Sequence, residues 1–230
     1  DVIVLGAGWY VQTVVVQIPT TVTRFTIRGA GSDKTRLIYT NDVHGITSTV
    51  TAGSNAYRIQ TATIEGFSMH FTLTATSTNS AIRLWGRNYD NAPALTPAHG
   101  NNLYPNYVIQ DVAVVRSLDP AGGTTTWPAA WTSHDSCWNK AFHLIDCAVV
   151  YMTNVFVRGS SGSRNGYGVY LESCTNVRIR NAYIMAVSVA FQYVHADYTL
   201  IGRGSPTSAN EGNGCEDIDV VDSSVYTVGW

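Results

Sequence analysis

One carboxylate and one imidazole are the side chains best suited to chemistry on a sugar. Glu172 lies in the segment GVYLES, and His143 lies in AFHLID, 29 residues earlier. Hydrolysis of a glycosidic bond needs a protonated carboxyl group and an ionised one, and the expected pair is Glu172 with Asp135. For β-elimination, His143 or Tyr170 would take the proton α to a uronate carboxylate, and Arg83 would neutralise that carboxylate. The residues leave both reactions open.

Aromatic and hydrogen-bonding side chains are the candidate contacts for a linear sugar chain. Tryptophan rings stack on the C–H surfaces of sugars, and half of the six tryptophans lie in residues 117–140. A loop of that length also needs apolar anchors, so packing is the alternative role for its tryptophans. For the candidates on strands, the alternative is an ordinary solvated face. The candidate binding residues are Arg83, Trp85, Trp127, Trp131, Trp138, Tyr170 and Gln192.

Four segments with alternating apolar residues must position these side chains: AIRLWG, AFHLID, GVYLES and AFQYVH. Period-two alternation places one set of side chains inward and the other outward. The expected inward residues are Ile82, Leu84, Phe142, Leu144, Val169, Leu171, Phe191 and Tyr193. The expected outward residues are Arg83, Trp85, His143, Ile145, Tyr170, Glu172, Gln192 and Val194. Large insertions at residues 87–106, 117–140 and 195–214 flank these segments and would wall a trough over the outward face.

A second recurring pattern is an apolar segment that reaches a Gly, Asn or Asp and continues as another alternating segment. These residues tolerate left-handed backbone torsions, so a sharp corner between two strands selects them. The corners are expected at Gly6, Gly29, Gly66, Asp111, Asn154, Asn181 and Asp222. The first interval is 23 residues, a period typical of stacked repeats. The sequence therefore predicts a single all-β domain over residues 1–230, a parallel β-helix with three strands per coil and about six to seven coils.

Three of the four cysteines share one position in this repeat. Cys147, Cys174 and Cys215 each lie seven residues before an expected corner. Stacked in successive coils, they can pair at most two at a time, so a disulfide framework is not expected. We interpret them as small, buried, reduced side chains, which favours folding in a reducing cytoplasm.

Composition argues against several partners. Only 13% of the residues are charged, the net charge is −2, and the 14 basic residues include just two lysines. No basic patch for nucleic acid or anionic membrane is indicated. The longest apolar runs are shorter than the roughly 18 residues of a membrane span, so membrane insertion is not expected. The histidines and acidic residues lack metal-ligand spacing, and we expect neither a metal nor a cofactor.

The repeat pattern runs to both ends of the sequence without a capping element. Stacked strands need their open ends covered. We therefore expect a segment of a longer polypeptide, with neighbouring domains of the same chain or a partner over the open ends.

The first forty residues resemble the opening of the pectate-lyase-like superfamily, which has the pectin lyase fold. The resemblance rests on a Gly-x-Tyr turn at residues 8–10, an Ile-Pro pair at 18–19 and a Thr-x-Arg-Gly-x-Gly segment at 26–31. It implies a right-handed parallel β-helix. With the reduced cysteines and long insertions, the chain is most similar to phage tailspikes and related polysaccharide depolymerases.

This resemblance implies a protein that binds and cleaves a bacterial surface polysaccharide as a glycoside hydrolase or polysaccharide lyase. It also implies a homotrimer, located on a virion tail or outside the cell. The calcium and arginine motifs of pectate lyases are not recognisable, so cleavage of pectate itself is not expected. Two alternatives remain: a non-catalytic virion spike or adhesin, and a secreted bacterial pectate-lyase-like enzyme.

Overall fold

A computed structural model describes residues 1–19, 22, 24–48, 61–71, 77–85, 107–116, 138–145, 147–159, 166–172, 174–194 and 215–226. Every regular element in these ranges is a β-strand, and every strand pairing is parallel. The all-β class and the parallel pairing predicted from the sequence are confirmed. The strands are β1 (Val2–Val4), β2 (Gly8–Gln12), β3 (Val16–Ile18), β4 (Arg24–Arg28), β5 (Thr35–Tyr39), β6 (Ile46–Ser48), β7 (Thr61–Phe71), β8 (Ser80–Trp85), β9 (Tyr107–Arg116), β10 (Lys140–Ile145), β11 (Ala148–Arg158), β12 (Tyr167–Glu172), β13 (Thr175–Arg180), β14 (Tyr183–Met185), β15 (Val189–Val194), β16 (Glu216–Val221) and β17 (Ser224–Tyr226).

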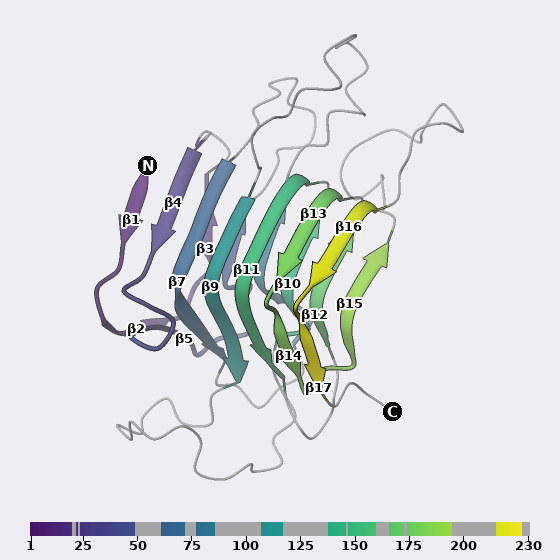
Figure 1. Ribbon diagram of the computed structural model, residues 1–230. Coiled ribbons are helices and arrows are strands. Elements are labelled where there is room, and N and C mark those ends of the chain that lie inside the picture. The colour runs from purple at the N-terminus through teal and green to yellow at the C-terminus, as the bar shows by residue number, and fades with distance from the viewer. Residues whose placement is uncertain are drawn as a thin grey trace.

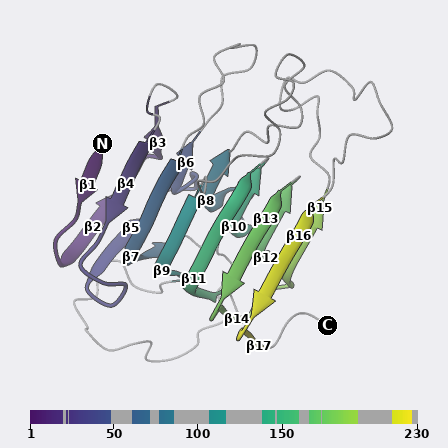
Figure 2. The ribbon, with the colours of Figure 1, turned by 45° about the horizontal axis from the view of Figure 1, so that its top comes forward.

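The chain alternates between two sheets. The larger sheet has 11 strands, with β1-β4-β7-β9-β11-β13-β16 as its main row, and the smaller has six, in the order β3-β6-β8-β10-β12-β15. Each return to a sheet adds a strand beside the previous one, so β1 and β16 lie at opposite ends of the larger sheet's main row (Figures 1 and 2). This order places side chains that are distant in sequence next to one another.

The alternating apolar residues form one core cluster that draws on both sheets. Six of the eight residues expected to face inward from the smaller sheet are completely buried: Ile82, Leu84, Phe142, Leu144, Val169 and Leu171. The other two lie on β15, the last strand of that sheet, where Phe191 is partly buried and Tyr193 is 42% exposed. Burial of these apolar side chains is the main stabilising contribution to the stacked strands.

Five of the seven expected corners stack in the larger sheet with left-handed torsions, whereas Gly6 and Gly29 do not have positive φ. Gly66, Asp111, Asn154, Asn181 and Asp222 all have positive φ, and the register places them in adjacent strands. The Nδ2 of Asn181 donates to the Oδ1 of Asn154 at 2.7 Å, which links two of these corners directly. Gly29 is required for a steric reason. A Cβ at this position would lie 2.1 Å from the carbonyl oxygen of Gly66 and would clash with it.

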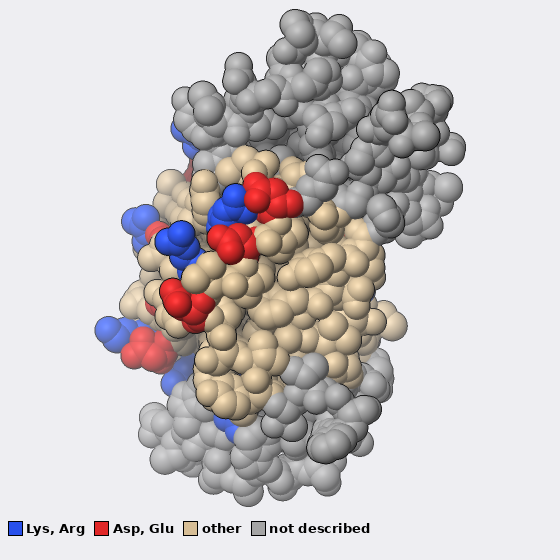
Figure 3. Space-filling model, turned by 45° about the vertical axis from the view of Figure 1, so that its right-hand side comes forward, with Lys and Arg blue, Asp and Glu red and all other residues tan. Residues whose placement is uncertain are grey.

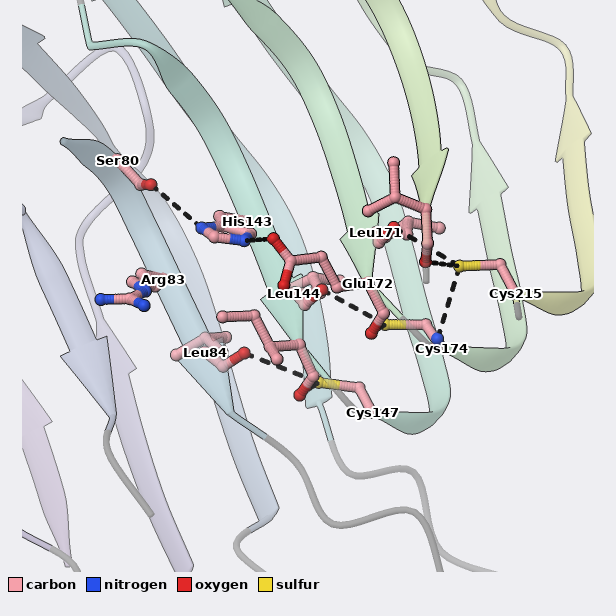
Figure 4. A network of polar contacts seen from close by, with 12 residues as sticks. Ser80, Arg83, Leu84, His143, Leu144, Cys147, Leu171, Glu172, Cys174 and Cys215 are labelled. Atoms are coloured by element: carbon pink, nitrogen blue, oxygen red, sulfur yellow. Dashed lines mark hydrogen bonds and ion pairs between the residues drawn. The ribbon is translucent and has the colours of Figure 1, made fainter. Parts of the chain in front are cut away.

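The three cysteines occupy one column, as their spacing predicts. Each thiol donates to the carbonyl oxygen of a buried leucine on the preceding strand of the smaller sheet (Figure 4). The Sγ···O distances are 3.7 Å from Cys147 to Leu84, 3.3 Å from Cys174 to Leu144 and 3.4 Å from Cys215 to Leu171. Cys147 and Cys174 are buried, and Cys215 is partly exposed. The thiols therefore satisfy backbone acceptors where the chain leaves the smaller sheet.

Candidate functional site

The outward side chains of the smaller sheet form two rows across its strands. One row contains Thr47, Arg83, His143, Tyr170 and Gln192, and the next contains Trp85, Ile145, Glu172 and Val194. These are the positions that the alternating pattern assigned to the outward face. Strands β8, β10 and β12 thus bring together the expected Arg83, His143, Tyr170 and Glu172.

His143 is held between two hydrogen-bond partners (Figure 4). Its Nε2 lies 2.8 Å from Oε1 of Glu172, and its Nδ1 lies 3.3 Å from Oγ of Ser80. A carboxylate only accepts hydrogen bonds, so we assign the ring proton to Nε2, and the Ser80 hydroxyl then donates to Nδ1. Both ring nitrogens of His143 are thereby engaged.

Burial lowers the pKa of His143, although the neighbouring Glu172 opposes the shift. The imidazole is therefore neutral near pH 7, in agreement with the tautomer assigned from its partners. The Glu172 side chain is 20% exposed, whereas that of His143 is 8% exposed. Of the two carboxylate oxygens of Glu172, Oε1 has a hydrogen-bond partner among the described residues and Oε2 has none. Oε2 is therefore the oxygen available for chemistry.

Two side chains that the sequence analysis did not select complete one side of the site. Lys140 places its Nζ 4.6 Å from the ring centroid of Tyr170 and 5.9 Å from that of Tyr167. The two tyrosine rings meet edge to face at 4.9 Å, and Tyr170 meets His143 in the same way at 5.2 Å. Lys140 pairs with Tyr167 in the strand register, but both have the parity of the inward residues, so the alternating pattern did not mark either as outward.

His44 is a third residue that the sequence analysis missed. The backbone N–H of Ser80 donates to its Nδ1 at 2.9 Å, and its Nε2 lies 3.4 Å from Nη1 of Arg83. Burial first, and then the charge of Arg83, lower the pKa of His44 to about 4. Its ring is therefore neutral near pH 7. It lies just before β6 and no local motif marks it, because only strand pairing brings it to Arg83.

Arg83 and Trp85 carry buried hydrogen-bond donors. The Nε of Arg83 and the Nε1 of Trp85 have no hydrogen-bond partner within the described part of the chain. The guanidinium carbon of Arg83 lies 5.2 Å from the Trp85 ring centroid. Burial lowers the pKa of Arg83 while Glu172 raises it. Buried polar groups in proteins are normally hydrogen-bonded, so these two donors require an explanation.

The remaining predicted residues separate into three groups. Gln192, on β15, pairs with Tyr170 of β12, and its Nε2 donates to the carbonyl of Tyr193 at 3.4 Å. Trp138 is 3% exposed, packs against the rings of Tyr39 and Phe71, and donates from Nε1 to the carbonyl of Val43. Its observed role is packing, and the site described here does not include it. Asp135, Trp127 and Trp131 lie outside the described residues.

No family model, curated protein or solved structure matches this chain. The described residues contain no helix with the length and hydropathy of a membrane span. They also contain no group of three or more metal-ligating side chains arranged around one point.

The acidic residues near the C-terminal end belong to a different surface. Nη2 of Arg178, on β13, lies 2.9 Å from Asp217, and its Nε lies 4.0 Å from Asp219. Figure 3 shows basic and acidic side chains gathered next to one another, on a face whose described atoms otherwise belong mostly to uncharged residues. These carboxylates form exposed ion pairs across two strands.

Proposed function

We propose that the chain winds as a right-handed parallel β-helix of the pectate-lyase-like superfamily, with three strands per coil. The strict alternation between two parallel sheets supports this winding. The stacked corners and the cysteine column support it independently, because each recurs once per pass through the two sheets. Such a column provides a long, regular face on which a linear polymer can lie.

We propose that this face binds and cleaves a bacterial surface polysaccharide, as in a phage tailspike or related depolymerase. The observation that carries the proposal is the hydrogen-bonded pair of His143 and Glu172 on the outward face of the smaller sheet. Aromatic rings and two cations adjoin this pair. A glycan-cleaving site needs this combination of a positioned carboxylate, stacking surfaces and hydrogen-bonding groups.

In the proposed mechanism Glu172 transfers the proton and His143 positions it. The hydrogen bond from Nε2 fixes one carboxylate oxygen of Glu172, and the other has no hydrogen-bond partner among the described residues. In β-elimination, Glu172 removes the proton α to a uronate carboxylate, the C–O bond at the β carbon breaks, and an acid protonates the leaving oxygen. In hydrolysis, Glu172 acts with a second carboxylate on the opposite side of the glycosidic bond, for which Asp135 is the sequence-based candidate.

The competing proposal is a non-catalytic virion spike or adhesin. The observation that favours it is the apolar surface at the end of the column. Val2, Ile3 and Val4 on β1 are 67%, 50% and 69% exposed, and β1 pairs only with β4 among the described strands. We propose that a neighbouring domain of a longer polypeptide covers this edge, since an uncovered apolar edge strand promotes aggregation.

The tailspike proposal also includes a homotrimer, assembly on a virion tail or another extracellular location, and prior folding in a reducing cytoplasm. The buried thiols support the last of these.

Cleavage is tested by incubating the protein with a panel of capsular and O-antigen polysaccharides. New reducing ends would show cleavage, and ultraviolet absorbance of unsaturated uronates would identify elimination. Reducing ends without new absorbance would identify hydrolysis. Binding without cleavage of any polysaccharide would favour the adhesin, and the absence of both would contradict the proposed function.

A further inference from the structure

We propose that the site recognises the carboxylate of an acidic sugar, held by Arg83, Trp85 and His44. This inference rests on the proposed polysaccharide-binding function and specifies its substrate class as a uronate-containing glycan. The inference is based on hydrogen-bond donors without acceptors on β8 and just before β6, beside the strand that carries His143.

The first observation is two donors that face each other. Because Ser80 N–H donates to Nδ1 of His44, the neutral ring carries its proton on Nε2. That N–H faces Nη1 of Arg83 at 3.4 Å, and a guanidinium has no acceptor. Neither group satisfies the other. An acceptor oxygen placed beside both atoms would accept from each of them.

The second observation is the pair of buried donors next to them. Arg83 Nε and Trp85 Nε1 have no hydrogen-bond partner among the described residues. Arg83 and Trp85 lie two residues apart on β8, and the guanidinium lies 5.2 Å from the indole ring. All the unsatisfied groups are donors, so the missing ligand is an acceptor. A carboxylate offers two acceptor oxygens in the planar geometry that a guanidinium binds.

The third observation is the local charge. Arg83 and Lys140 are cations, Glu172 is the carboxylate that interacts with both, and His44 and His143 are neutral near pH 7. The described site therefore has a net charge of about +1 and favours an anion. Lys140 lies over the rings of Tyr167 and Tyr170, so this side of the site carries aromatic side chains of the kind that contact sugar rings. A free inorganic anion would have no use for these aromatic surfaces.

The test compares acidic capsular polysaccharides that contain hexuronic acid with the same polysaccharides after reduction of their carboxylates to alcohols. Binding is measured by calorimetry in the Glu172→Gln chain, so that the polymer is not consumed. We expect binding to weaken about tenfold or more on carboxyl reduction, because charged hydrogen bonds are lost. Arg83→Gln should cause a similar loss with the unreduced polymer, and Trp85→Phe a smaller one.

Matched controls are Arg180→Gln, an exposed arginine on the larger sheet, and Trp9→Phe, an exposed tryptophan on β2. Both should bind the acidic polymer as the parent does, and urea unfolding should show that every variant is folded. Equal binding of acidic and carboxyl-reduced polymers would overturn the inference and leave the proposed function intact. Equally tight binding of sulfated glycans that lack carboxylates would overturn the assignment to carboxylate. If no polysaccharide binds, both proposals fail.

Discussion

His143 and Glu172 are joined by a 2.8 Å hydrogen bond that runs diagonally across two strands. His143 pairs with Tyr170 in the register, and Glu172 lies two residues further along β12. Both side chains project from the same face because side chains alternate along a strand. This arrangement lets a buried imidazole orient a partly exposed carboxylate.

Stability should fall as the pH drops below neutral, in part through His70. Its Nε2 lies 2.9 Å from Oγ of Ser68, and burial, followed by the charge of Arg36, lowers its pKa from 6.5 to about 4. The unfolded chain then binds more protons between these values, so stability present above pH 6.5 is lost as the pH falls towards 4. The shift corresponds to at most about 3 kcal/mol.

The measurement is the free energy of unfolding in urea at several pH values between 7 and 4. His70→Gln should show a shallower loss over that window than the parent, because the variant side chain does not titrate there. Identical pH profiles for the two proteins would contradict the predicted contribution of His70.

The corner at Asn154 should discriminate between alanine and glycine. Asn154 has a φ of 52° and accepts a hydrogen bond from Asn181. Both substitutions remove this hydrogen bond, but only alanine keeps a Cβ that opposes the left-handed torsion. We expect Asn154→Ala to be about 1–2 kcal/mol less stable than Asn154→Gly. Equal urea midpoints would show that the torsion does not determine the residue at this corner.

Truncation of Trp138 should lower the free energy of unfolding as much as truncation of a core residue does. Its ring contacts Tyr39 and Phe71, and its Nε1 donates to the Val43 carbonyl at 3.0 Å. Trp138→Ala should destabilise the fold by about 3–5 kcal/mol, measured by urea unfolding. A surface platform for sugars would lose far less, so a change below about 1 kcal/mol would argue against the packing seen here.

The cysteine column predicts an order of chemical reactivity. Cys147 and Cys174 are completely buried, whereas Cys215 is partly exposed. Under native conditions a thiol-alkylating reagent should therefore modify Cys215 well before the other two, with the sites identified by mass spectrometry. In urea all three should react at similar rates. Native labelling of Cys174 as fast as Cys215 would contradict the burial of this column.

Much of the fold could be predicted because the repeat has a local chemical signature. A single glycine, asparagine or aspartate marks each corner in the stack that includes Gly66, Asp111, Asn154, Asn181 and Asp222, and alternation marks the strands around it. The second stack of corners was not predictable in this way. It contains Val149, Asn176 and Asp217, all with positive φ. Asn176 and Asp217 are residue types that favour such a corner, but a β-branched valine is a poor left-handed residue, so no residue type recurs through the whole stack.

In the candidate site too, some residues could be predicted from the repeat and others could not. Arg83, His143, Tyr170 and Glu172 share one face because they occupy equivalent positions in aligned strands, which alternation reveals. His44 could not be found in this way, since it lies before β6 and reaches Arg83 only through pairing between separate segments. The sequence left Trp138 between sugar stacking and packing, because an aromatic ring serves both roles equally well, and its burial in the structure shows the packing contact.

The most direct test of a polysaccharide-cleaving site on the smaller sheet is the cleavage rate of Glu172→Gln compared with that of Glu65→Gln. Glu65 is the matched control, because it lies on the larger sheet in an ion pair with Arg28. With a polysaccharide that the parent protein cleaves, release of reducing ends should fall about 100-fold or more in Glu172→Gln and remain at the parent rate in Glu65→Gln. Parent-level cleavage by Glu172→Gln, with polysaccharide binding retained, would contradict the account.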